Sequence, residues 1–219
     1  MSDEASYPQN HSPACLSLWL KLAYSAFVLV LIPVYWVEYG PVNFLWLCDI
    51  ALLVTYVALW LKNRLLISMM AVGLLLPELV WNADFFSHLF AGHDMFGFDA
   101  TAYMFSPDIP LYVRSLSLFH VFLPIVLVHA LLRLGYDPRA GLAQTLLAWI
   151  VMPVSYLVSG PDRNINWVYG LTEIPQTWLP GGFYVLAVML VYFLLVIWPT
   201  HLVLKYLLKY RSTGLQARP

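Results

Sequence analysis

The chain has 219 residues, of which 61% are hydrophobic and only 11% are charged, and its formal net charge is −1. Soluble domains carry about a quarter charged residues, so this composition excludes an ordinary soluble protein and predicts one that crosses a membrane several times. A near-neutral chain without a basic stripe is also excluded as a nucleic-acid-binding protein. Two cysteines, Cys15 and Cys48, are too few for a disulfide framework.

Six stretches are long and apolar enough to cross the hydrocarbon core, which takes about 20 mostly apolar residues. They cover residues 16–37, 42–61, 65–84, 112–134, 141–159 and 182–204. We therefore predict an all-α fold, a polytopic membrane bundle of six transmembrane helices. The bundle occupies residues 16–208, between a polar N-terminal tail of residues 1–15 and a basic tail of residues 209–219.

The distribution of basic residues predicts the orientation. Nine of the eleven Lys and Arg residues fall on the side that holds both termini, and only Arg114 and Arg163 fall on the other. The positive-inside rule then places both termini in the cytoplasm and the protein in a plasma membrane or bacterial inner membrane. Four tryptophans lie near the predicted outer boundary and suggest an aromatic belt: Trp36, Trp81, Trp167 and Trp178.

Polar residues recur at one depth in three of the predicted spans. Because a helix rises 1.5 Å per residue, Cys48 and Glu78 lie about 9 Å below the outer surface and His120 about 12 Å below it. Asp49 directly follows Cys48. Ionisable groups inside a membrane usually face the bundle interior or a wet cavity. The pattern predicts a polar pocket that opens toward the outer surface.

Other polar residues fall near this pocket. Asn82 lies four residues after Glu78 on the same helix face, and Ser117 lies three residues before His120. Arg114 lies at the rim above them. These side chains are candidates to support a reaction in the pocket.

A thiol and an imidazole at one depth suggest acyl transfer. The thiolate is the nucleophile, and a neighbouring histidine can generate it by accepting the proton. Cys48 would attack a lipid acyl ester and His120 would move the proton, with Asp49, Glu78 or Asn82 orienting the ring and Arg114 holding a phosphate. A purely structural alternative is that Cys48 only fills space in the core. Asp49 and Glu78 would then only form hydrogen bonds between helices.

Four stretches carry a resemblance to a known family. They are LCDIALLVTYVALWLKNRLLISMMAVGLLLPEL, RSLSLFHVFLPIVLVHAL, NINWVYG and the final apolar span. Their order resembles the bacterial YwaF-like integral membrane proteins, whose animal relative is a transmembrane acyltransferase that remodels ether phospholipids. The resemblance implies a Cys–His acyl-transfer pair, which by position is Cys48 and His120. It also implies a supporting role for Asn166, in the Asn-Trp element before the last span.

The loop after the third span supports a second hypothesis. Asp84 and His88 stand at i and i+4, and His93 and Asp94 follow. Three His or carboxylate ligands suit a catalytic zinc, and intramembrane lipid amidases of the alkaline ceramidase type resemble this pattern. The same residues could instead form only a solvated acidic loop, which is what a run of charged residues most often does. Acyl transfer needs no cofactor, whereas this hydrolase would need zinc.

A third hypothesis is a non-catalytic protein that binds lipid or assists assembly. Membrane lipids are the expected partners under all three hypotheses.

Overall fold

The computed structural model describes residues 16–97, 100–172 and 174–216, with side chains up to residue 208. This described part is helical and contains no strand. In chain order its elements are α1 (Leu18–Glu38), η1 (Pro41–Leu45), α2 (Leu47–Leu61), α3 (Arg64–Ala91), η2 (Ala102–Met104), α4 (Leu111–Leu116), α5 (Phe119–Leu134), α6 (Ala140–Arg163), η3 (Ile165–Trp167), α7 (Gly181–Tyr192), η4 (Phe193–Ile197) and α8 (Trp198–Gln216). The predicted tail of residues 1–15, with Cys15, lies outside the described residues.

Five helical stretches of the described chain are long and apolar enough to cross a membrane: Leu18–Glu38, Arg64–Ala91, Leu111–Leu134, Ala140–Arg163 and Gly181–Leu208. These stretches support a multi-pass integral membrane protein. The predicted second span differs, because Pro41–Leu45 forms a 3₁₀ helix and α2 has only 15 residues. At 1.5 Å per residue α2 is about 22 Å long, which is short of the roughly 30 Å hydrocarbon core.

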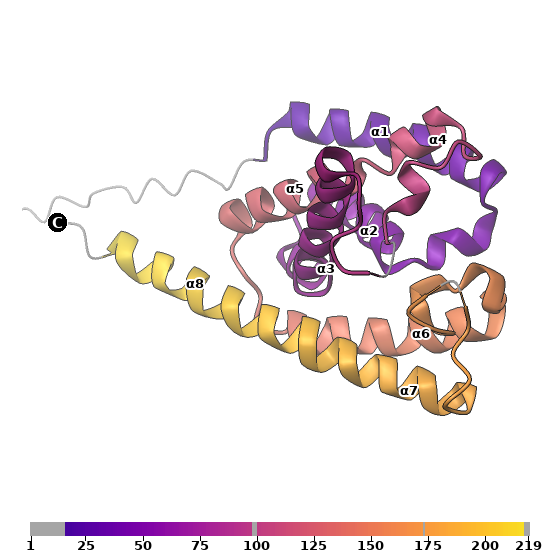
Figure 1. Ribbon diagram of the computed structural model, residues 1–219. Coiled ribbons are helices and arrows are strands. Elements are labelled where there is room, and N and C mark those ends of the chain that lie inside the picture. Colours follow the sequence, from indigo (N-terminus) through magenta and orange to yellow (C-terminus); the bar gives the residue numbers. More distant parts are fainter. Residues whose placement is uncertain (1–15, 98–99, 173, 217–219) are drawn as a thin grey trace, which may run out of the picture.

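Helix α3 lies at the centre of the bundle, and it packs against α2, α5, α6 and α8 (Figure 1). It runs seven residues beyond the predicted end at Asp84. One apolar core joins α3 to α1, α2 and α5, and a second joins it to α6, α7 and α8. The outward faces carry exposed apolar side chains such as Leu29, Leu157 and Leu195, as expected of surfaces that face lipid.

Two further predicted spans depart from a continuous α-helix. The fourth is divided into α4 and α5 at Ser117 and Leu118, so His120 is the second residue of α5. The last span runs as one long rod along the edge of the bundle (Figure 1), with a π-helical segment at Phe193–Ile197 between α7 and α8. Such bulges inside α-helices frequently occur at functional sites.

Proline 77 creates a gap in the backbone hydrogen bonds of α3. Because Pro77 has no N–H, the carbonyl of Gly73 has no donor four residues further along the helix. The hydroxyl of Tyr192, on the last turn of α7, donates to this carbonyl oxygen at 2.7 Å. The side chain of one helix thus satisfies a backbone group that a proline of another helix leaves open.

We predict that Tyr192→Phe destabilises the protein by about 1–3 kcal/mol, the penalty for a buried polar group left without a partner. Pro77→Ala restores the N–H that Gly73 needs, so the penalty of Tyr192→Phe should largely disappear in that background. Denaturant unfolding of the four proteins in the double-mutant cycle measures this coupling. Equal penalties in both backgrounds would show that the Tyr192 hydroxyl does not replace the missing N–H.

Candidate functional site

A histidine and a glutamate form a buried pair between α3 and α5. The Nδ1 atom of His120 lies 2.7 Å from Oε2 of Glu78, a hydrogen-bond distance. The two residues are 9% and 1% exposed, so the pair is almost completely removed from solvent. A carboxylate at Nδ1 fixes the ring orientation and the tautomer that carries the proton there. Nε2 is then the ring nitrogen that can accept a proton from a reacting group.

Two aromatic rings hold the His120 ring from its faces. Trp81 stacks on it with ring centroids 4.4 Å apart, and Phe119 stacks at 4.1 Å. Trp81 is buried, which corrects the expectation that it belongs to an aromatic belt at the membrane boundary. It lies three residues after Glu78 on α3, so one helix face supplies both the carboxylate and the stacking ring.

A second proline gap determines the position of His120. Pro124 removes the N–H that would bond the carbonyl of His120. Asn82 donates from Nδ2 to this carbonyl oxygen at 2.7 Å, and also to the carbonyl oxygen of Glu78 at 2.7 Å. The single amide of Asn82 therefore ties the backbones of both members of the pair together.

Cys48 and Asp49 lie in the first turn of α2, at its N-terminus. Since α2 begins only at Leu47, Cys48 does not lie about 9 Å inside a helix that begins at residue 42, as the sequence predicted. The Cys48 side chain is half-buried and packs against the apolar core between α1, α2, α3 and α5. Asp49 is 2% exposed and accepts a hydrogen bond from Nδ2 of Asn43 at 2.9 Å.

Asn166 anchors the start of α2. Its Oδ1 accepts a hydrogen bond from the backbone N–H of Leu47, and its Nδ2 donates to the Leu45 carbonyl and to Oγ of Ser155. Asn166 and Trp167 both adopt positive φ angles, of 57° and 60°. Such angles cost roughly 1–2 kcal/mol for residues with a Cβ, so this turn is held by its contacts. It fixes the register of the helix that carries Cys48.

Ser117 and Arg114 have partners other than the His120 ring. The Ser117 hydroxyl lies 2.7 Å from the Tyr35 hydroxyl of α1, and Arg114 donates to the Met104 carbonyl at 2.9 Å. Burial raises the pKa of Tyr103, in the loop between α3 and α4, and this effect outweighs the hydrogen bond with the Ser117 side chain, which lowers the pKa. Tyr103 therefore stays a neutral hydroxyl beside this site.

The structure thus brings Glu78, Asn82 and His120 into direct contact. Sequence reasoning missed the partners Tyr35, Asn43, Trp81 and Tyr103. Trp81 carried a usable signal, because its spacing of three residues from Glu78 puts both on one helix face. The contacts of Tyr35 and Tyr103 depend on loops and helix pairs that no local pattern specifies.

The acidic loop forms a different arrangement from the zinc site considered above. The Asp84 carboxylate accepts hydrogen bonds from the Met95 N–H and from the N–H and hydroxyl of Thr101, so it closes the loop after α3. His88 stacks on Phe105. His93 lies 2.9 Å through Nδ1 from the Asp94 carbonyl oxygen. Among the described residues, no three His, Cys, Asp or Glu side chains gather closely enough to hold a metal ion.

Comparison with known proteins matches the chain to no family model, no curated protein and no solved structure. The interpretation of the site therefore rests on its geometry. A dry, stacked imidazole that is oriented by a carboxylate is suited to move a proton between bound groups.

We predict that Asn82→Ala destabilises the protein by about 1–3 kcal/mol, because it leaves the His120 carbonyl without a donor in the membrane interior. Pro124→Ala supplies the missing N–H and should recover most of this loss. Unfolding measurements on the single and double variants test the coupling. Ser115→Ala, which removes a hydroxyl bonded only within α4, is the matched control and should change stability little.

Proposed function

We propose that this protein is an integral membrane enzyme that transfers acyl chains from phospholipid esters, with Cys48 as nucleophile and His120 as general base and acid. Both termini lie in the cytoplasm under this proposal, and the reaction takes place in the outer half of a plasma or bacterial inner membrane. The observation that carries it is the buried Glu78–His120 pair. Purely structural helix contacts need no stacked, carboxylate-oriented imidazole.

Nucleophilic catalysis of this kind uses a nucleophile, a base and a carboxylate that orients the base. His120 is the base and Glu78 is the orienting carboxylate. Glu78 holds Nδ1 at 2.7 Å, so Nε2 is the atom that takes the proton. The imidazolium that forms is stabilised by the adjacent carboxylate. Cys48 lies on α2, which packs on both α3 and α5, and Asn166 fixes the start of that helix.

The reaction has two halves. Nε2 of His120 takes the thiol proton as the sulfur of Cys48 bonds to the ester carbonyl carbon. The carbon–oxygen ester bond then breaks, and the imidazolium returns the proton to the departing lysolipid alkoxide. In the second half Nε2 of His120 takes the proton of a hydroxyl of water or of another lysolipid as that oxygen bonds to the thioester carbonyl carbon. The carbon–sulfur bond then breaks, and the imidazolium returns the proton to the departing thiolate of Cys48. No oxidant and no cofactor are required.

We predict that Cys48→Ala and His120→Ala each abolish release or exchange of phospholipid acyl chains. Glu78→Gln should lower the rate by about 100-fold or more, because it removes the anion that orients and charges the base. A phospholipid with a labelled acyl chain, supplied in vesicles with the purified protein, gives the measurement. When no lysolipid acceptor is supplied, mass spectrometry of rapidly quenched samples should detect an acyl group on Cys48 before water hydrolyses the thioester.

His129→Ala is the matched control, since His129 lies on the same helix as His120 and lines a separate apolar surface groove with Leu20, Ile125 and Val126. It should retain full activity. Activity that persists in Cys48→Ala would exclude the thiol as nucleophile. Wild-type protein that retains lipid without any turnover would instead support the non-catalytic lipid-binding hypothesis.

A further inference from the structure

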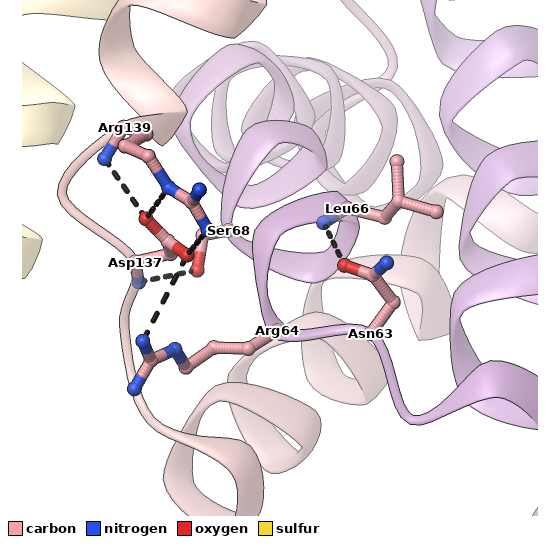
Figure 2. Close-up of polar contacts among 6 residues, drawn as sticks. All are labelled: Asn63, Arg64, Leu66, Ser68, Asp137 and Arg139. Carbon is pink, nitrogen blue, oxygen red and sulfur yellow. Dashed lines mark hydrogen bonds and ion pairs between the residues drawn. The ribbon is translucent and has the colours of Figure 1, made fainter.

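A second polar cluster lies at the N-terminal end of α3, around Asp137 in the loop between α5 and α6. Arg139 approaches this carboxylate with Nε at 3.1 Å and Nη2 at 2.8 Å, which is a two-point contact. Arg64, the first residue of α3, reaches Oδ2 with Nη2 at 3.8 Å. Both guanidinium groups thus point to one carboxylate from different helices (Figure 2).

The carboxylate at the centre is firmly held. The Asp137 side chain is 4% exposed, and its backbone N–H donates to Oγ of Ser68, a fully buried residue of α3, at 2.9 Å. Hydrogen bonding from Arg139 lowers the pKa of Asp137 to about 2. Asn63 caps the start of α3 by accepting from the Leu66 N–H (Figure 2). The Asp137 carboxylate is therefore an anion held in place between the N-termini of α3 and α6.

The arginines themselves remain open to the surroundings. The side chains of Arg64 and Arg139 are 54% and 75% exposed. A guanidinium has five N–H donors, and Arg139 uses two of them on the Asp137 side chain. Two guanidiniums against one carboxylate leave one net positive charge. The two guanidinium groups thus lie beside one another with N–H donors left over, which could bind a second anion.

The surroundings of this pair are apolar on the membrane side. Leu61 lies three residues before Arg64 and is 66% exposed, and Leu142 lies three residues after Arg139 and is 70% exposed. Both arginines stand where apolar helices begin, which is the level of lipid headgroups. Basic pockets between helices at this level on the cytoplasmic side bind anionic headgroups.

We propose that Arg64 and Arg139, held by Asp137, bind the phosphate of an anionic phospholipid in the cytoplasmic leaflet, with the acyl chains along the leucines below. Arginine suits this role because its planar fork matches phosphate oxygens at two points. The bound lipid would join the starts of α3 and α6 and so stabilise the bundle. This proposal does not depend on the acyl-transfer reaction.

The test measures lipid binding to the full-length protein in detergent by native mass spectrometry and by thermal unfolding. We expect phosphatidylglycerol to bind and to raise the melting temperature more than phosphatidylcholine, whose headgroup carries a compensating cation. Arg64→Gln and Arg139→Gln should each weaken phosphatidylglycerol binding about tenfold. Arg64→Lys, which keeps the charge but loses the fork, should weaken it measurably as well.

Arg133→Gln is the matched control, because Arg133 is an exposed arginine on the last turn of the neighbouring α5. The proposal is overturned if Arg133→Gln weakens binding as much as Arg64→Gln does, since the lipid would then sense only general positive charge. It is also overturned if inorganic phosphate at millimolar concentration reproduces the full stabilisation. Arg64 makes no hydrogen-bond-length contact to Asp137, so Arg64→Gln tests the site even if Arg139→Gln fails to fold.

Discussion

The structure depends on one constraint, which is that backbone polar groups inside a membrane must find partners within the protein. Two prolines in the central helices break this rule locally. The carbonyl that Pro77 leaves open is satisfied by Tyr192 of α7, and the one that Pro124 leaves open is satisfied by Asn82 of α3. These contacts link α3 to α7 and α3 to α5. Each proline removes one hydrogen bond within its own helix, and the bond that replaces it joins two helices.

Both residues of the proposed catalytic pair, and the supporting Asn166, stand where a helix is interrupted. His120 follows the break between α4 and α5, and Cys48 lies in the first turn of α2 after a 3₁₀ segment. Asn166 adopts a left-handed conformation in the turn that anchors α2. Interrupted helices offer positions and directions that a regular helix interior does not, and membrane transporters use them in the same way. Under the proposed function the irregular segments would carry the chemistry, while the regular helices carry the apolar surface.

The sequence predicted the helical class because apolar stretches of membrane length dominate the chain. It also placed Cys48, Asp49, Glu78 and His120 at one depth, because ionisable groups inside a membrane usually face the bundle interior. Of these, Glu78 and His120 are in contact, and the pairing of Cys48 with His120 stays a prediction. It did not predict that Pro41–Leu45 leaves the α-helix, because apolar composition alone does not distinguish a 3₁₀ segment from an α-helix. Nor did it predict the stacking of Trp81 on His120, since tryptophan is equally suited to a membrane boundary. The orientation of the bundle and the reaction itself remain proposals.

The two polar clusters at different levels of α3 have different physical characters. Glu78 lies 14 residues after Arg64, about 21 Å along the helix, so one lipid headgroup cannot contact both. The Glu78–His120 pair is dry and enclosed, which strengthens its electrostatic interactions and suits proton transfer. The Asp137 cluster presents exposed guanidiniums, which suits reversible binding of a charged headgroup rather than chemistry. A lipid held by Arg64 and Arg139 would accordingly be a structural lipid of the inner leaflet, and the substrate of His120 a different molecule in the outer one.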